Sequence, residues 1–416
     1  MPIHVVTYGG IAVHGLTVNG GSHTLNINGN RVTIDAIDSD DVLMNVQRPG
    51  EGQGNVHVPA LSDNDRARGW RRLGCAAPGV LAYGVDSDKV VILPRGGVDW
   101  MAALPDGRAL ADLCIPGTHE SAALSGGFIS ECQSVDIKQQ LIDGVRFFDI
   151  RVKLVNGELK IYHGIQPQNS TLQQQVTWIE EFLRLHPRET VIASIKQENA
   201  DEERFPEAVE EMLKHSGMWR FDEPLPTLGQ CRGRAQFFSR FGKKHGEQFP
   251  NGQGIKPLRW PNSVQNGFVE QVHGIDFRVQ DWYDTDNIPD KAAACITHLE
   301  PTLPPRGLGS DSNHPYSLTF LSAGRLNSPP AYMASGTGAG TVSKTIAVAT
   351  SLFAASKRAG DEGGVNARVG AWLLRNAFQG RRPRATLMLD FYRDTGGPDG
   401  GMAELIASLN YINLNE

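Results

Sequence analysis

The stretch IPGTHES at positions 115–121 decides the expected fold, because it joins an apolar, strand-like run to a group of polar side chains. The run ends in a Pro-Gly pair and then presents Thr118, His119 and Glu120. In a parallel (β/α) barrel, the carboxyl end of each strand lies on the face that carries the active site. The stretch therefore predicts a barrel strand that delivers His119 and Glu120 to a catalytic rim.

Strand-like apolar runs recur along the rest of the chain, and some are separated by helical periodicity. The clearest helix is expected at 171–186, with Thr171 as its N-cap and Pro187 after its end. Eight runs can be counted, which is the number that a (β/α) barrel needs. We expect the strands at 113–117, 145–151, 159–163, 190–196, 235–240, 276–281, 317–322 and 385–391.

Residues 1–95 follow a different pattern from the rest of the chain. Short alternations of apolar and polar residues, such as HTLNINGNRVTIDAI at 23–37, are interrupted by glycine-rich turns. The pattern predicts a small β-rich accessory domain at 1–95, followed by a catalytic barrel at 96–416. This domain could bind lipid or could only stabilise the barrel, and the sequence leaves both roles open.

Composition excludes several classes of protein. Of the 416 residues, 40% are hydrophobic and 21% are charged, which are ordinary values for a folded chain. The net charge of -6 argues against a general electrostatic grip on nucleic acid or on anionic membranes. The five cysteines are scattered without zinc-site spacing, so we expect mostly reduced core thiols. Neither a secretory signal nor an apolar span of about 18 residues is visible, and the localisation stays open.

Polar side chains recur at the ends of the later runs. Each has a structural interpretation by itself: a single histidine after a strand is usually not catalytic, and Asp149 with Arg151 could be an ion pair. Asp390 is harder to explain in this way, because an acid inside the apolar run LMLDFY needs a partner. Repetition at one rim favours a shared site. Its expected members are His119, Glu120, Asp149, Arg151, His163, Lys196, Arg240, Asp281, Tyr283 and Asp390.

Two imidazoles beside a guanidinium suit one kind of chemistry, the cleavage of a phosphodiester by an internal hydroxyl group. A neutral histidine accepts the proton of the attacking hydroxyl, and a protonated histidine donates a proton to the leaving oxygen. The guanidinium stabilises the charge that grows on the phosphate. This reaction needs no metal.

In its motifs and their order, the chain resembles the bacterial-type phosphatidylinositol-specific phospholipases C with an X domain. The resemblance covers about residues 100–416 and includes IPGTHES, QQLIDGVRFFDIRV, KIYHG, FLRLHPRETVIASIKQE, FFSRF, VQDWY and LDFY. It implies a distorted, partly open (β/α)8 barrel of the TIM type. It also implies a phosphoric diester lyase that converts phosphatidylinositol to diacylglycerol and inositol 1,2-cyclic phosphate, through attack of the inositol 2-hydroxyl on phosphorus.

The resemblance assigns catalytic roles by motif position. His119 matches the general base, and Asp390 the carboxylate that orients it. His163 matches the general acid. Arg151 matches the phosphate-binding arginine, and Asp149 the acid that holds this arginine. Metal-dependent relatives carry a calcium ligand at the position of Arg151, so the resemblance implies an enzyme without a metal or other cofactor.

The resemblance also assigns a binding site for the inositol ring to Lys196, Arg240, Asp281 and Tyr283. One position departs from the family, which commonly has THDS where this chain has THES. Glu120 therefore replaces the aspartate that assists the general acid, and its extra methylene moves the carboxylate by about 1.5 Å. Displacements of about 1 Å can cost roughly 10²-fold in rate, so we expect Glu120→Asp to raise turnover.

Two other functions stay open at this point. One is a metal-dependent barrel phosphodiesterase acting on other glycerophospholipids or on sphingolipids, and the other is a catalytically silent, lipid-binding barrel. The expected partners are an inositol lipid and, transiently, a membrane surface, which rim aromatics such as Phe128 and Trp282 would contact. We expect a monomer that binds no nucleic acid.

Overall fold

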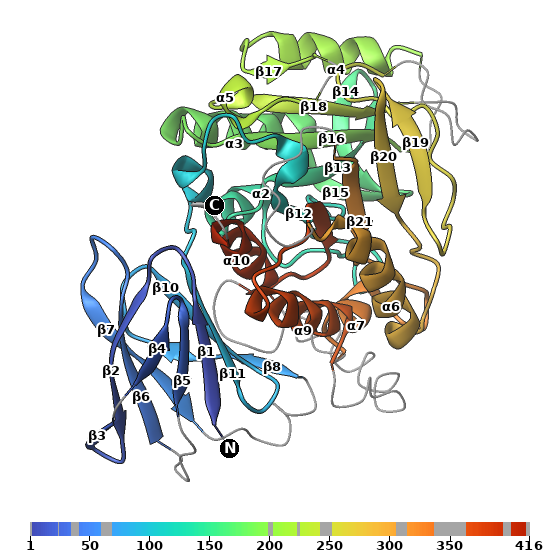
Figure 1. Cartoon of the computed structure of the whole chain (residues 1–416). Helices are drawn as coiled ribbons and strands as arrows, with labels where there is room; N and C mark the ends of the chain where they lie inside the picture. The colour runs from blue at the N-terminus through green and yellow to red at the C-terminus, as the bar shows by residue number, and fades with distance from the viewer. Residues whose placement is uncertain are drawn as a thin grey trace.

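The computed structural model describes residues 2–23, 25–34, 41–59, 69–198, 203–222, 225–241, 252–304, 314–336, 363–393 and 401–412. Two small sheets formed by residues 3–94 lie beside one large, curled sheet with its helices (Figure 1). Among the described residues, no helix has the length and apolar character needed to cross a membrane.

The large sheet has the strand order β17-β18-β16-β13-β12-β22-β21-β20-β19, and its first eight strands are parallel. Strand β19 is antiparallel to β20. In the described ranges, β17 and β19 do not pair with each other, so the sheet curls like a barrel but stays open. The bounds are β12 Cys114–Thr118, β13 Phe147–Val155, β16 Val191–Gln197, β17 Trp219–Arg220, β18 Ala235–Arg240, β19 Phe268–Val272, β20 Ile275–Gln280, β21 Tyr316–Phe320 and β22 Ala385–Leu389.

Seven of the eight expected strands belong to the parallel sheet, but the run at 159–163 does not. It forms β14 (Glu158–His163), which pairs antiparallel with β13 and then with β15 (Gln166–Thr171). The chain reverses at Asn156 and Gly157, whose φ angles of 52° and 81° suit a tight hairpin turn. The eighth parallel strand is instead β17, which has only two residues.

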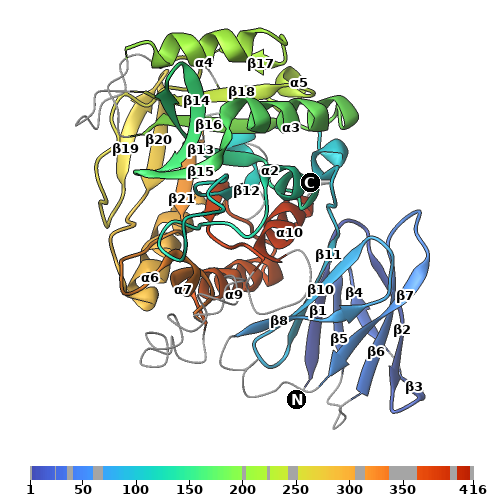
Figure 2. The same cartoon turned by 180° about the vertical axis from the view of Figure 1, so that it is seen from behind.

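The helix expected at 171–186 is confirmed as α3 (Leu172–Leu185), with the Thr171 side chain accepting a hydrogen bond from the Gln174 amide. Seen from behind, α3 runs alongside β16 and β18 (Figure 2). The other α-helices are α2 Ile137–Ile142, α4 Phe205–Lys214, α5 Leu228–Cys231, α6 Ile288–Leu299, α7 Pro330–Ser335, α9 Val365–Phe378 and α10 Gly401–Ser408. Short 3-10 turns cover Trp100–Ala103, Leu110–Asp112, Glu300–Thr302 and Leu409–Tyr411.

The N-terminal strands form two sheets, with the orders β4-β5-β1-β11-β10-β8 and β3-β2-β6-β7-β9. Apolar side chains of both sheets share one buried cluster. The bounds are β1 Ile3–Thr7, β2 Ala12–Val18, β3 Gly21–His23, β4 Asn26–Asn28, β5 Arg31–Ile34, β6 Asp41–Gln47, β7 Gln53–Pro59, β8 Trp70–Arg72, β9 Gly74–Cys75, β10 Val80–Val85 and β11 Lys89–Pro94.

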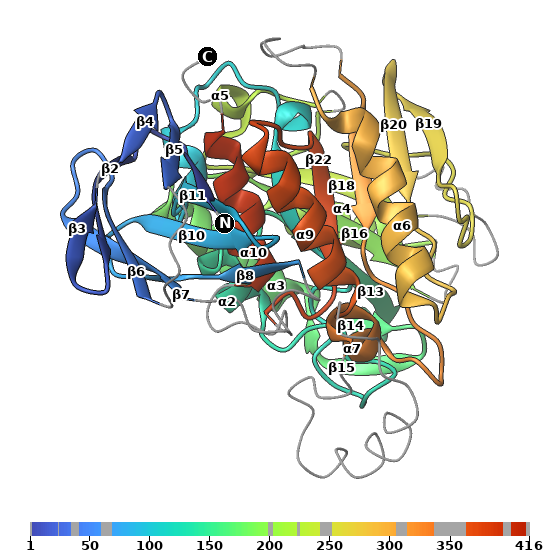
Figure 3. The ribbon, with the colours of Figure 1, turned by 60° about the horizontal axis from the view of Figure 1, so that its bottom comes forward.

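The first of these sheets also packs against α9 and α10 (Figure 3). The Trp70 indole donates a hydrogen bond to the Ala367 carbonyl at 2.7 Å, and Arg72 forms an ion pair with Glu404 at 2.9 Å. Trp70 belongs to the same buried cluster as the apolar residues of the large sheet. The division into domains at residue 95 stays a prediction, and the two parts share a core across that boundary.

Candidate active site

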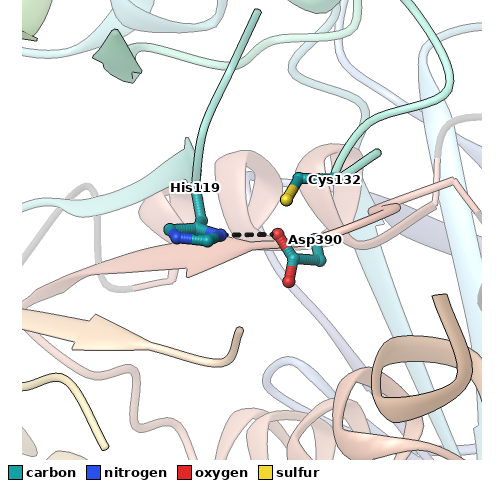
Figure 4. Close-up of side chains that lie close together, drawn as sticks. All are labelled: His119, Cys132 and Asp390. Carbon is teal, nitrogen blue, oxygen red and sulfur yellow. Dashed lines mark hydrogen bonds and ion pairs between the residues drawn. The ribbon is translucent and has the colours of Figure 1, made fainter. Parts of the chain in front are cut away.

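His119, which directly follows β12, lies between the Asp390 carboxylate and the Arg151 guanidinium. Its Nδ1 is 2.9 Å from Asp390 Oδ1 just after β22, and its Nε2 is 2.8 Å from an Arg151 nitrogen on β13 (Figure 4 shows the His119–Asp390 contact). Arginine can only donate, so Nε2 is the accepting nitrogen of the neutral ring and Nδ1–H donates to Asp390. This tautomer leaves the Nε2 lone pair as the basic atom of the site.

Backbone and amide contacts fix the turn that carries this histidine. The amide nitrogen of Gln133 donates to the carbonyls of His119 and Leu389, both at 2.8 Å, and so joins the ends of β12 and β22. Glu120 has a φ of 41°, a left-handed conformation that costs energy for a residue with a Cβ. Its backbone N–H donates to Asp149 Oδ2 at 3.3 Å. The strained turn therefore points the Glu120 side chain into the site.

Three carboxylates surround the Arg151 guanidinium. The nearest is Glu120 at 2.6 Å, followed by Asp149 at 3.3 Å and Glu198 at 3.4 Å. Contacts on several of its nitrogens hold the guanidinium in one orientation, which a single ion pair would not do. The structure thus presents a fixed cation beside the His119 base.

The second histidine of the site, His163, lies at the end of β14. Its Nδ1 is 2.8 Å from the Ser130 carbonyl and 3.4 Å from Glu120 Oε2. Because a carbonyl only accepts, Nδ1 carries a hydrogen and donates it. The other ring nitrogen, Nε2, is then the atom that can exchange a proton with a substrate.

The side chains expected around the inositol ring form a connected group. Lys196 lies 3.4 Å from Glu198, and Arg240 lies 3.6 Å from Asp149. The Arg240 guanidinium also stacks 3.7 Å from the centre of the Trp260 ring. That indole donates to Asp281 Oδ2 at 2.8 Å, so one aromatic residue connects two of the expected binding side chains.

Tyr283 differs from these residues because 39% of its surface is exposed. Its hydroxyl makes a hydrogen bond to Asn262 Oδ1. A ring that is held at its hydroxyl and partly exposed can lie against a sugar-like ligand. All ten residues expected from the sequence therefore lie at the same end of the sheet.

Burial and neighbouring charges set the protonation of the site. Burial and the Arg151 cation lower the pKa of both His119 and His163. Burial and Arg151 also lower the pKa of Lys196. For Asp149, burial opposes ionisation, but Arg151 and Arg240 outweigh it and the pKa is lowered. At neutral pH, His119 is therefore unprotonated, as a general base requires.

Several residues of the site were not among those expected from the sequence. Ser130, Gln133 and Trp260 lie in loops without periodicity, so no pattern marked them. Glu198 is different, because the sequence places it with Lys196 at the end of the same strand-like run, and at two-residue spacing both point to the same side of the extended chain. Cys132 is also present, and with His119 and Asp390 it forms a group of side chains that could hold a metal ion.

Comparisons with known proteins find relatives of one kind. Residues 108–238 match the family model described as phosphatidylinositol-specific phospholipase C, X domain. A 1-phosphatidylinositol phosphodiesterase of Listeria monocytogenes is 32% identical over 154 residues, which are 34% of this chain and 48% of that relative. A relative with the same name from Staphylococcus aureus is 24% identical, over 50% of this chain and 70% of its own length. The alignment thus spans about half of the Listeria relative.

Solved structures show the same fold. A phosphatidylinositol-specific phospholipase C from Staphylococcus aureus superposes with a TM-score of 0.57 at 21% identity, covering 75% of this chain and 97% of its own. The enzyme of that name from Listeria monocytogenes gives a TM-score of 0.52 at 23% identity, with coverages of 75% and 98%. Residues 108–238 are therefore similar to the phosphatidylinositol-specific phospholipase C X domain, and the chain shares a barrel-like α/β fold with these solved structures, which confirms the resemblance drawn from its motifs.

Proposed function

We propose that the chain is a phosphatidylinositol-specific phospholipase C, a phosphoric diester lyase that releases diacylglycerol and inositol 1,2-cyclic phosphate. One observation carries the proposal: Asp390, His119 and Arg151 form a continuous contact chain, and His163 lies beside the same arginine-bound Glu120. A base, a phosphate-binding cation and an acid are therefore adjacent. The names of the Listeria and Staphylococcus relatives support the same activity.

In the first half of the proposed reaction, His119 Nε2 removes the proton of the inositol 2-hydroxyl, and the resulting oxygen attacks phosphorus. Arg151 donates to this Nε2 when no substrate is bound. A bound phosphate would take over that donor, which frees the lone pair and places the attacked phosphorus next to the base. Asp390 stabilises the imidazolium that forms, because its carboxylate accepts from Nδ1 at 2.9 Å.

In the second half, the bond from phosphorus to the diacylglycerol oxygen breaks, and protonated His163 donates the Nε2 proton to that oxygen. The Ser130 carbonyl accepts from Nδ1 and favours the charged ring, although burial and Arg151 lower the pKa of His163 overall. His119 ends the step protonated and His163 ends it neutral. Proton exchange with water restores both groups.

The head group would bind on the side of Arg151 that faces Lys196 and Arg240. Lys196 and Arg240 would donate to ring hydroxyls, Asp281 would accept from one, and Tyr283 would lie against the ring. The ion pairs of Lys196 and Arg240 to carboxylates hold these donors in place before the substrate arrives. No metal takes part in this mechanism.

The lipid chains require contact with a membrane surface, and we assign this contact to the rim of the site. Phe128 and Trp282 are half-buried there, and the neighbouring Ile129 and Ile165 are exposed by 47% and 88%. Side chains of this kind insert into the interfacial region of a bilayer. The double variant Phe128→Ala/Trp282→Ala should reduce sedimentation with phosphatidylinositol vesicles, and unchanged vesicle binding would contradict this assignment.

Turnover of phosphatidylinositol vesicles in excess EDTA tests the proposed function. Wild type should release diacylglycerol, and His119→Ala should lose this activity. His186→Ala is the matched control, because this histidine pairs with Asp99 far from the site and its loss should change little. Activity that depends on added calcium or magnesium would replace the proposal with a metal-dependent enzyme. A wild type that binds vesicles but cleaves nothing would favour a silent lipid-binding barrel.

A further inference from the structure

A buried thiol lies next to the catalytic dyad and has no part in the proposed reaction. Cys132 is fully buried in the segment that follows β12, and its sulfur faces His119 and Asp390 (Figure 4). Its backbone is held on both sides: its N–H donates to the Ala123 carbonyl at 3.0 Å, and its own carbonyl accepts from Phe391 N–H at 2.9 Å. The position of the sulfur is therefore set by the fold.

Cys132, His119 and Asp390 each offer one ligand atom, and these three atoms lie within 4.8 Å of one another. Zinc binds sulfur at about 2.3 Å and nitrogen or oxygen at about 2.0–2.2 Å, so tetrahedral ligand atoms are roughly 3.3–3.7 Å apart. A contraction of about 1 Å would close this group around an ion. We propose that Cys132, His119 and Asp390 form a site for Zn²⁺ or another thiophilic divalent cation, and that its occupancy inhibits the enzyme.

Two independent features of the group favour binding of a cation. Asp390 Oδ2 is buried and has no hydrogen-bond partner within the described residues, although a buried carboxylate oxygen normally has one. The Cys132 sulfur makes only distant contacts in those residues, at 3.9 Å to the Ser130 carbonyl and to His163 Nδ1. A cation between these atoms would supply the partner that Asp390 Oδ2 lacks in the described residues, and it would give the sulfur a shorter contact than those at 3.9 Å.

The set of ligands determines which cation fits. A thiolate, an imidazole and one carboxylate are the donors that zinc prefers, whereas calcium and magnesium require several oxygen ligands. Three protein ligands also leave a fourth position open for water. His119 is the most accessible of the three, with 13% of its side chain exposed, so the ion would enter from the rim of the site.

Metal binding would inhibit the enzyme because it displaces protons from Cys132 and from His119 Nδ1. This inhibition rests on the proposed function. The Cys132 thiol loses its proton to solvent when sulfur binds the metal. His119 Nδ1 can bind only after its proton moves to Nε2, because Nδ1–H now donates to Asp390. The Nε2 atom then carries hydrogen and cannot accept the proton of the inositol 2-hydroxyl. Asp390 is also withdrawn from the imidazole that it would stabilise.

Metal binding can be measured without any substrate, by competition for Zn²⁺ against a chromophoric chelator. We expect wild type to bind one Zn²⁺ that Cys132→Ala binds at least about 100-fold more weakly, since even second-shell losses cost about 10- to 100-fold. Cys231→Ala, a buried thiol in α5, is the matched control and should bind as wild type does. Equal affinities of wild type and Cys132→Ala would overturn the proposal.

A second measurement uses wild type alone, so it does not depend on whether Cys132→Ala folds. Co²⁺ in place of Zn²⁺ should give a thiolate-to-metal charge-transfer band, and its absence would overturn the proposal. In turnover assays, Zn²⁺ should inhibit wild type, and Cys132→Ala should need at least about 100-fold more Zn²⁺. Zinc that binds at Cys132 without slowing turnover would refute the inhibition. If wild type cleaves no phosphatidylinositol, the proposed function fails, while the chelator titration still decides the metal site.

Discussion

Replacing Asp390 by asparagine tests the part of the mechanism that the geometry defines best. The carboxylate accepts from His119 Nδ1 at 2.9 Å in a buried position, and it would face an imidazolium in the transition state. Two unit charges about 4 Å apart attract by about 4 kcal/mol at an effective dielectric constant of about 20. Asparagine retains a neutral hydrogen bond worth about 1 kcal/mol. The variant would therefore lose about 3 kcal/mol of transition-state stabilisation, which corresponds to a fall of roughly 10²-fold in kcat.

The assay is release of diacylglycerol from phosphatidylinositol vesicles, with kcat and KM measured separately. KM should change little, because Asp390 does not contact the substrate in the proposed mechanism. Asp136→Asn is a matched control: this aspartate caps α2 by accepting from the Gln139 amide at 2.9 Å, and asparagine caps a helix equally well. A fall in kcat of less than about threefold in Asp390→Asn would refute the reasoning. The negative charge of Asp390 would then contribute less than about 1 kcal/mol to stabilising the transition state.

Three further predictions follow from other parts of the structure. Glu120→Asp should raise turnover. The Glu120 carboxylate lies 3.4 Å from His163 Nδ1, and this distance is longer than that of a strong charge-assisted hydrogen bond. Unchanged or lower turnover would contradict this prediction. The kcat/KM profile should lose activity as pH rises through the pKa of His163, which must be protonated to act and which burial and Arg151 hold below the ordinary 6.5. His119, whose pKa is also lowered, sets the acidic limb, and an alkaline limb centred above 6.5 would be inconsistent with these shifts. Trp70→Ala should lower the free energy of unfolding by about 3–5 kcal/mol in a single calorimetric transition, since Trp70 joins the N-terminal strands to α9; two independent transitions would show separate cores.

The strands of the large sheet were largely predictable because buried parallel strands are continuous apolar runs. The run at 159–163 was assigned wrongly, although the Asn156-Gly157 pair before it is a typical hairpin signal. Strand β17 has two residues, Trp219 and Arg220, and a segment of that length shows no periodicity. It is recognisable only from its pairing with β18, which is a tertiary contact.

The charged residues of the site were predictable because strand ends place them on one rim. The residues that hold them were not, because loops carry no repeating pattern. Trp260 connects Arg240 to Asp281 from such a loop, and Ser130 sets the tautomer of His163 through a backbone carbonyl that any residue could supply. Sequence likewise gave no indication that the Cys132 sulfur lies beside the dyad.

The central claim is that the attacking group is a hydroxyl of the substrate and not water. Phosphorus NMR of the reaction in ¹⁸O-enriched water and excess EDTA tests it most directly. The mechanism predicts that the first product is inositol 1,2-cyclic phosphate without ¹⁸O on phosphorus, formed by wild type and absent with His119→Ala. An acyclic inositol phosphate that carries ¹⁸O from the first turnover would contradict the account, because water would then be the nucleophile.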